Sequence, residues 1–182
     1  MRAGALADLR LLLALAGSML LVQVGNSLSG DALNVWGLVP RHVEALPGIV
    51  LSPWLHGSWA HLLSNLSGLL ILGTLVLLRS RRDFLRASAF IILVSGLLVW
   101  LCGRIGLHIG ASGWLFGFWG LLLARAWFER SLLDLLLAAL VFLLYGGWLF
   151  GLLPRDGVSF EYHLAGALSG VLYAALWRKK RI

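Results

Sequence analysis

Six apolar runs, joined by polar connections, constrain the fold of this chain more than any other feature of its sequence. A soluble single domain of 182 residues has no interior large enough for a chain that is 60% hydrophobic. We therefore expect lipid to be the solvent for most of the chain, which predicts one all-α polytopic membrane domain over residues 1–182. The expected spans are residues 11–24, 58–78, 84–102, 112–128, 132–150 and 163–177.

Basic residues are distributed unevenly among the connections between these runs. If the N-terminus faces the cytoplasm, twelve of the 15 Lys and Arg residues lie on the cytoplasmic side, and the other three are Arg41, Arg104 and Arg155. Because cytoplasmic loops of membrane proteins are enriched in Lys and Arg, this bias predicts a six-helix bundle with both termini cytoplasmic. The net charge of +7 is then a topology signal, and no basic stripe interleaved with aromatic residues indicates a nucleic-acid partner.

The first apolar run has a second interpretation, since a basic N-terminal region before a short apolar core is also typical of a signal peptide. Its small-x-small sequences, residues 14–16 and 16–18, lie inside the run and not after it, which favours a retained helix. A long outer loop, residues 25–57, follows. Three prolines interrupt it, and its scattered apolar side chains predict that it lies in the interfacial zone of the membrane.

The fourth run is short for a membrane span. Residues 113–127 cover only roughly 22 Å at 1.5 Å per residue, against about 30 Å of hydrocarbon. We therefore expect its N-terminus to lie below the outer membrane surface, with the glycine-rich segment 103–110 dipping in ahead of it. Irregular backbone is stable at that depth only where protein encloses it or where it lines a wet cavity. This predicts that Ser112 lies in a buried pocket that opens to the outer side.

Ser112 is the candidate nucleophile of this pocket. The start of a helix adds unpaired backbone N–H groups and the positive end of the helix dipole, both of which favour developing negative charge. Gly110 and Gly113 are expected to let the backbone turn sharply around the serine. Taken alone, this pattern also fits ordinary packing of membrane helices through small residues.

His163, at the start of the sixth run, is the candidate general base. Gly166 and Gly170 lie three and seven residues further on, so they share a helix face with this histidine. Such a face lets a neighbouring helix approach closely, which would bring His163 to Ser112. The alternative is a histidine at the membrane interface beside a glycine packing face.

A third polar group lies in the first half of the second run. His61 and Asn65 are four residues apart and project from one helix face. Because burial of such groups is costly without partners, we expect them to face the interior, either as an oxyanion hole or as a structural clasp. His56 is expected near the same network. A metal site of His56, His61 and His163 is less favoured because no carboxylate or thiolate is placed to complete it.

Together, these motifs resemble those of the rhomboid family of intramembrane serine proteases. The resemblance covers about residues 11–177 and implies a Ser-His dyad without an acidic third member, an oxyanion hole that includes the Ser112 backbone N–H, and no metal or organic cofactor. The residues that carry it are His61-x-x-x-Asn65, Gly110-x-Ser112-Gly113 and His163-x-x-Gly166-x-x-x-Gly170.

The resemblance also implies a ring at Phe116 packed against the catalytic histidine, one helical turn after Ser112. It implies a small bacterial protein of the inner (plasma) membrane that cleaves transmembrane or membrane-anchored substrates near the outer side of the bilayer. The family's outer loop usually contains a Trp-Arg pair. Here Trp36 is followed by Gly37 and Arg41 stands apart, so the sequence leaves open how this loop is anchored.

Three other functions remain open from the sequence alone. One is rhombosortase-like processing of C-terminal sorting tails, since small bacterial rhomboids include that type. A non-proteolytic rhomboid-like protein that binds transmembrane clients would need neither Ser112 nor His163. A transporter or channel would carry paired charges on several spans, whereas Asp134 is the only acid close to the interior of a span.

Overall fold

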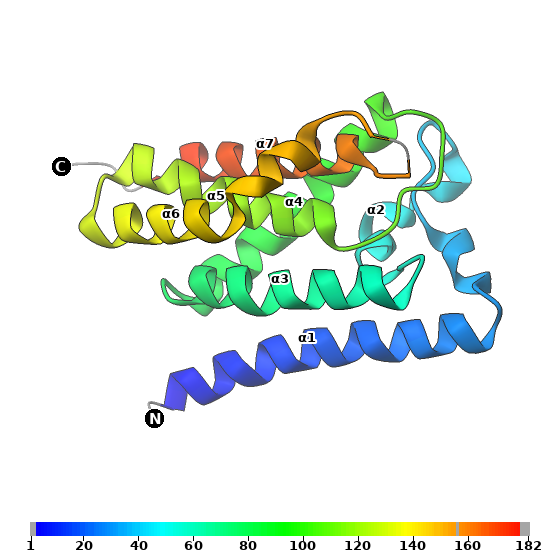
Figure 1. Cartoon of the computed structure of the whole chain (residues 1–182), viewed down its shortest axis with the longest axis horizontal. Helices are drawn as coiled ribbons and strands as arrows, with labels where there is room; N and C mark the ends of the chain where they lie inside the picture. The colour runs from blue at the N-terminus through cyan, green and yellow to red at the C-terminus, as the bar shows by residue number, and fades with distance from the viewer. Residues whose placement is uncertain (1–2, 156, 179–182) are drawn as a thin grey trace.

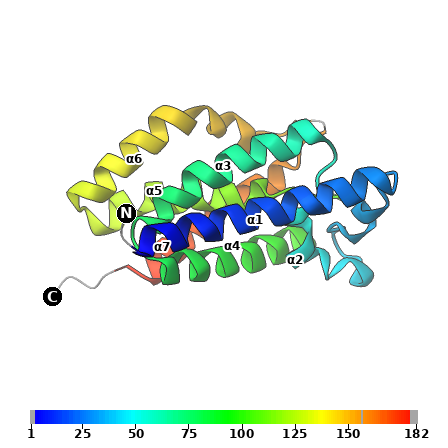
Figure 2. The same ribbon diagram turned by 90° about the horizontal axis from the view of Figure 1, so that it is seen from below.

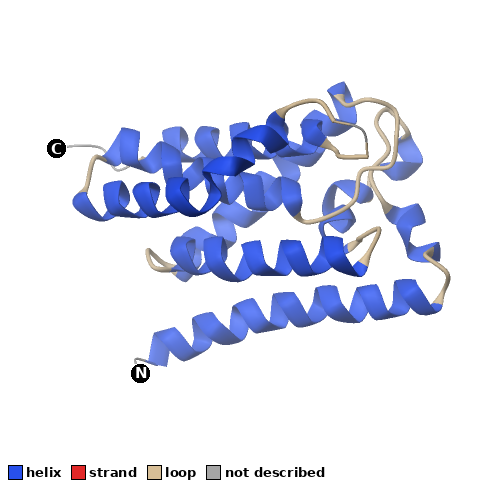
Figure 3. Cartoon of the chain, viewed as in Figure 1, coloured by secondary structure: helices blue, strands red, loops and turns tan. Residues whose placement is uncertain are grey.

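The computed structural model describes residues 3–155 and 157–178, and within these ranges it consists of helices and connecting loops (Figure 3). The outer loop contains four short helices, and a 3₁₀ helix follows the fifth long helix. The long helices are α1 (Ala3–Leu28), α3 (Trp59–Leu77), α4 (Arg81–Cys102), α5 (Ser112–Glu129), α6 (Leu132–Tyr145) and α7 (Phe160–Leu176). The short ones are η1 (Ala32–Trp36), η2 (Val43–Ala45), α2 (Gly48–Leu51), η3 (Ser52–Trp54) and η4 (Gly146–Leu152).

In the described part of the chain, four segments are long and apolar enough to cross a membrane: Gly4–Leu28, Trp59–Leu77, Arg81–Cys102 and Leu132–Leu152. The fold is therefore that of a multi-pass integral membrane protein. The other two long helices, α5 and α7, have 18 and 17 residues.

Two expected spans differ from the helices by more than three residues at an end. The first helix is longer than residues 11–24, because its polar first turns find a partner: Asp8 pairs with Arg81 at 2.8 Å. The fifth expected span, 132–150, is an α-helix only as far as Tyr145. Tyr145, with φ −128° and ψ 16°, leaves the α-helical conformation, and the 3₁₀ helix η4 begins at Gly146.

Helix α5 is the centre of the bundle and contacts α3, α4, α6 and α7 (Figure 1). Every residue from 113 to 122 is buried, as expected for a helix that is apolar on all sides. Helix α1 lies along α3 at the edge of the molecule, and α6 lies on a different side (Figure 2). The start of α1 and the end of α7 are at the same end of the bundle (Figure 1).

Glycines allow α5 and α7 to pack backbone against backbone. A Cβ at Gly166 would lie 1.9 Å from the Gly113 carbonyl oxygen, and a Cβ at Gly170 would lie 1.9 Å from the Gly117 carbonyl oxygen. Neither position can hold a side chain without separating the two helices. The glycine face predicted from the sequence therefore faces α5, the helix that begins at Ser112.

Ion pairs join the helices at the end of the bundle where α1 begins. Arg79, between α3 and α4, contacts Glu129 and Asp134 at 2.8 Å each, which joins it to the end of α5 and the start of α6. Arg125 pairs with Asp83, whose other oxygen accepts a hydrogen bond from the hydroxyl of Tyr173 at 3.0 Å. Asp134 is thus buried as a paired carboxylate.

The outer loop is anchored to the α4–α5 connection by its backbone. Leu38 and His108 exchange backbone N–H···O hydrogen bonds of 3.0 and 2.8 Å. The Arg41 side chain donates to the carbonyl of Gly103 at 2.9 Å, and its backbone N–H donates to the carbonyl of Trp100 at 2.9 Å. These contacts hold the loop across the end of the bundle where α5 begins.

Candidate active site

Ser112 and His163 lie within hydrogen-bonding distance across the α5–α7 interface. Ser112 is the first residue of α5, His163 lies in the first turn of α7, and the distance from Ser112 Oγ to His163 Nε2 is 2.9 Å. His163 Nδ1 lies 2.8 Å from the carbonyl oxygen of Gly151, which can only accept. Nδ1 therefore carries the proton in the neutral ring, and Nε2 is free to accept the hydrogen of the Ser112 hydroxyl.

The ring of Phe116 covers one face of the His163 imidazole. Their centroids are 4.2 Å apart and their planes differ by 10°. The indole of Trp148 stacks on the other face of Phe116, with centroids 4.5 Å apart at 27°. The stack restricts rotation of the imidazole.

Gly110 brings the backbone before Ser112 against His61 and Asn65. Its φ of 111° is a conformation that residues with a side chain rarely adopt. A Cβ at this position would lie 2.6 Å from the His61 ring and 3.4 Å from Asn65 Nδ2. Ser58 caps α3 by accepting the His61 backbone N–H, which sets the first turn of the helix that carries both side chains.

Asn65 is buried, and its Nδ2 has no hydrogen-bond partner within the described ranges. A buried amide donor without a partner is unusual in a folded protein and requires an explanation. Because this donor lines the same cavity as Ser112, a ligand oxygen in that cavity is a suitable acceptor for it.

His56 is fully buried and meets the His61 ring edge-on, with centroids 5.0 Å apart. Burial and the neighbouring His61 lower the pKa of His56 from its ordinary value of 6.5 to about 4. His56 is therefore a neutral packing partner of His61 at neutral pH. No group of three or more His, Cys, Asp or Glu side chains suited to a metal ion is found in the described part of the chain.

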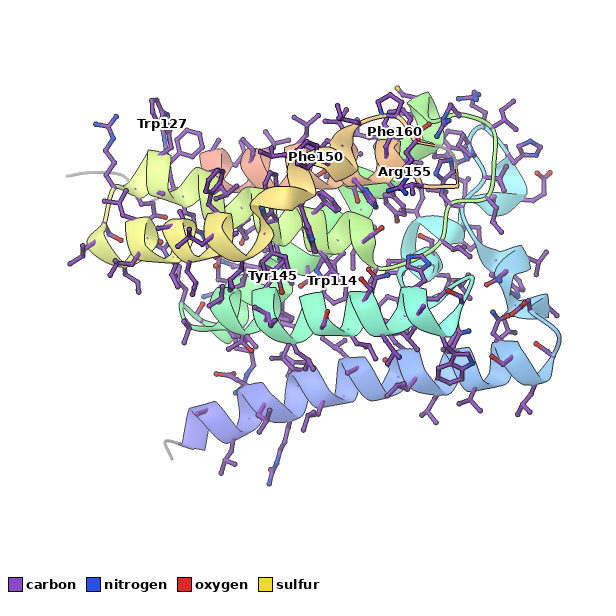
Figure 4. All side chains as sticks on the ribbon, viewed as in Figure 1. Trp114, Trp127, Tyr145, Phe150, Arg155 and Phe160 are labelled. Carbon is purple, nitrogen blue, oxygen red and sulfur yellow. The ribbon has the colours of Figure 1, made fainter. Side chains whose placement is uncertain are left out.

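A cavity of about 790 Å³ is lined by Ser112 and His163, at the end of the bundle where the outer loop is. Phe116 and Trp148 give it an apolar wall. Arg155, labelled in Figure 4, belongs to the connection before α7 and lines the cavity. The polar residues that line the cavity include Ser58, His61, Ser64, Asn65, Ser112, Arg155, Ser159 and His163.

Two expectations about the glycines have different outcomes. A sharp turn is present at Gly110 but not at Gly113, which lies inside α5 and is not among the positive-φ glycines of the described chain. Gly113 instead leaves room for Tyr162, whose ring carbon Cδ2 would lie 2.5 Å from a Cβ there. The Tyr162 hydroxyl shares a 2.8 Å hydrogen bond with Ser52, which ties the outer loop to α7.

Sequence reasoning missed two residues of η4, Gly151 and Trp148. A backbone carbonyl can accept a hydrogen bond whichever side chain its residue carries, so no residue type could have pointed to Gly151. The sequence Gly146-Gly147-Trp148 after a long apolar run is the only signal of the change in helix type, and tryptophan is common at membrane interfaces for other reasons.

Comparison with known proteins gives two kinds of match. Residues 44–180 match the family model of the Rhomboid domain. An uncharacterized protein of Mycobacterium tuberculosis is 39% identical over 166 residues, which cover 86% of this chain and 69% of that protein. A Mycobacterium leprae protein, also uncharacterized, is 36% identical over 166 residues, covering 86% and 66%.

RHOMBOID-like protein 1 of Arabidopsis thaliana is 32% identical over 126 residues, which cover 65% of this chain and 31% of that protein. The family match includes α3 to α7, and so it contains every residue that lines the cavity at Ser112 and His163. This chain belongs to the rhomboid family.

Proposed function

We propose that this protein is an intramembrane serine endopeptidase that cleaves transmembrane or membrane-anchored proteins near the outer side of the bilayer, with Ser112 as nucleophile and His163 as general base. The observation that carries the proposal is the 2.9 Å contact between Ser112 Oγ and His163 Nε2 at the base of a cavity. The contact joins residues 51 positions apart in sequence, on two helices that meet through glycines.

The first step is attack of Ser112 Oγ on the carbonyl carbon of the scissile peptide bond. His163 Nε2 takes the hydroxyl proton as the Oγ–C bond forms, and the carbonyl π electrons move to the oxygen. The imidazolium that results donates through Nδ1–H to the Gly151 carbonyl, 2.8 Å away. Phe116 keeps the ring in the plane that both contacts require.

The oxyanion of the tetrahedral intermediate would lie between the start of α5 and the first turns of α3. The donors offered there are Asn65 Nδ2–H, which is otherwise unpaired, the His61 ring, and the Ser112 backbone N–H at the positive end of the α5 dipole. Donors aimed at charge that develops only in the transition state are among the largest contributors to catalysis.

Collapse of the intermediate breaks the C–N bond, and His163 Nε2–H protonates the leaving amine. Water then attacks the acyl-enzyme with His163 again as base, which releases the second product and restores the Ser112 hydroxyl. Water reaches the cavity from the end of the bundle that carries the polar loops, where Ser58, Ser64 and Ser159 line it.

We further propose six membrane spans with both termini in the cytoplasm. α1 begins and α7 ends at one end of the bundle (Figure 1), which an even number of spans requires. That end also carries the arginines that follow α3, so the positive-inside rule assigns it to the cytoplasm and assigns the cavity to the outer side.

The test of the proposal is labelling of the purified protein by a fluorophosphonate, which reacts covalently with activated serines. Wild type is expected to label, and Ser112→Ala and His163→Ala are expected to abolish labelling while remaining folded. A transmembrane peptide substrate would then be cleaved by wild type alone.

Three results would count against the proposal. Folded wild type that does not label, or that labels equally without His163, would make a non-proteolytic client-binding protein the better explanation. Labelling combined with cleavage of sorting tails alone would favour the rhombosortase-like function.

A further inference from the structure

We propose that η4 acts as a positioning clamp for the general base: the backbone carbonyl of Gly151 takes the place of the acidic residue that a Ser-His dyad lacks. This inference rests on the proposed function. Gly151 is a positioning residue, because it acts on the reaction through His163 and does not touch the reacting atoms.

η4 reaches His163 in two independent ways. Its Gly151 carbonyl accepts from Nδ1 at 2.8 Å, at the edge of the imidazole. Its Trp148 indole stacks on Phe116 at 4.5 Å, and Phe116 stacks on the imidazole at 4.2 Å, so η4 also supports the face of the ring. One short helix thus sets both the in-plane rotation and the tilt of the base.

The Gly151 carbonyl provides part of the stabilisation that a carboxylate would provide, without the free-energy cost of burying a charge. It fixes the proton on Nδ1, so that Nε2 faces Ser112 as an acceptor, and it stabilises the imidazolium by a hydrogen bond. A carboxylate would stabilise the imidazolium more strongly but would need to be buried as a charge. Glu161, two residues before His163, pairs instead with Arg104.

The absence of a side chain at position 151 is what lets the carbonyl reach the imidazole. A Cβ on Gly151 would lie 2.9 Å from Phe116 Cζ and 3.5 Å from His163 Nδ1. The first contact is closer than carbon atoms tolerate, so a methyl group there must displace either the Phe116 ring or the η4 backbone. Both movements change the position of the acceptor.

η4 is the end of the segment formed by α6 and η4, which lies at the edge of the bundle. In α6, which leads directly into η4, only Asp134, Leu137 and Val141 are buried. η4 itself is held by Trp148, which packs near Gly68 of α3 as well as on Phe116. Movement of α6 away from α5 would therefore withdraw the Gly151 carbonyl, so the reactivity of Ser112 depends on how this helix is seated.

The first test is the tautomer of His163 in the full-length protein, measured by NMR with ¹⁵N-labelled histidine. Five histidines are present, and the His163 signals are those lost in His163→Ala. We expect Nδ1 protonated and Nε2 unprotonated at neutral pH. A ring protonated on Nε2 would overturn the inference, because the carbonyl could not then be its partner.

The second test compares Gly151→Ala with Gly146→Ala, a matched control in the same helix whose added methyl meets only ordinary contacts with Phe142, at 3.8 Å or more. Gly151→Ala is expected to slow fluorophosphonate labelling at least tenfold, to give a mixture of His163 tautomers, and to move the acid limb of the pH–rate profile to lower pH, since the imidazolium loses an acceptor. Gly146→Ala is expected to change none of these.

The other possible results of these two tests also support or overturn the inference. Slow labelling by Gly151→Ala with an unchanged tautomer and pH profile would mean a purely steric effect and would overturn it. If Gly151→Ala does not fold, Trp148→Leu replaces it, with the same expected changes in tautomer and rate. Wild type that shows the Nδ1–H tautomer but never labels would retain the hydrogen bond and refute the proposed function, so the two failures are distinguishable.

Discussion

The side-chain amide of Asn65 is buried beside the start of α5 with an unused N–H. If that N–H serves the oxyanion, its contribution exists only in the transition state. We expect Asn65→Leu, which keeps a similar volume but cannot donate, to lower kcat about 10²- to 10³-fold, or roughly 2.7–4 kcal/mol, with little change in KM. The measurement is steady-state cleavage of a transmembrane peptide substrate.

Ser67→Ala is the control for this change, because Ser67 lies on the exposed face of the same helix and bonds only to the Ser64 carbonyl. It is expected to leave kcat unchanged. An Asn65→Leu variant with wild-type kcat would mean that the unpaired amide is a structural feature and that the oxyanion is held by other donors.

The buried His56 predicts how the stability of the fold depends on pH. Since burial lowers its pKa from 6.5 to about 4, the folded protein resists protonation that the unfolded chain accepts. The full stability is therefore present above pH 6.5 and falls as the pH decreases from 6.5 towards 4, by up to about 3 kcal/mol from this residue. Unfolding free energies in mixed micelles between pH 4 and 7.5 measure the effect.

The expected signature is that His56→Gln flattens the pH dependence in this window, because glutamine does not titrate. His42→Gln is the matched control, since His42 is exposed on the outer loop and should leave the curve unchanged. Equal slopes for wild type and His56→Gln would show that other groups cause any loss of stability at low pH.

At the scale of elements, the α5–α7 contact determines whether the dyad can form. Gly170 lies two turns from His163, and a Cβ there would overlap the backbone oxygen of Gly117, which cannot rotate away. We expect Gly170→Ala to destabilise the protein by about 3 kcal/mol or more, at or beyond the upper end of overpacking costs, and to slow fluorophosphonate labelling because the helices must separate.

Gly17→Ala provides the comparison for this variant. Gly17 lies in α1 and an added methyl there has no atom within 4 Å, so both stability and labelling should be retained. If Gly170→Ala were as stable and as reactive as Gly17→Ala, the close approach of α5 and α7 would not be required for the dyad.

At the scale of the whole molecule, the proposed orientation can be tested with Cys102, the one cysteine of the sequence. It is exposed and ends α4, at the end of the bundle where the outer loop lies. We expect a membrane-impermeant maleimide to label it in intact cells. Arg82→Cys in a Cys102→Ser background should label only in inverted vesicles, because α4 begins at the opposite end.

The reverse pattern, with Cys102 protected and the cysteine at position 82 labelled in intact cells, would contradict the orientation inferred from the arginines. Labelling of both positions from one side would contradict the assignment of α4 as a span.

The periodicity and length of the apolar runs predicted the helices well, because lipid leaves the backbone few alternatives to a helix. The same reasoning placed His61 and Asn65 on one helix face and Gly166 and Gly170 on another, since residues three or four positions apart share a face. It could not foresee the change to a 3₁₀ helix at Gly146, because hydropathy does not distinguish two kinds of apolar helix.

The sequence by itself determined the all-helical membrane fold, the polar residues that lipid would not tolerate without partners, and the family to which the chain belongs. Only the tertiary structure decided that Ser112 meets His163, that Gly113 makes room for Tyr162 and that the Gly151 carbonyl lies within hydrogen-bonding distance of His163 Nδ1. The physical reason is that these contacts join separate helices. Their distances depend on how closely two backbones pack, which no local pattern of residues encodes.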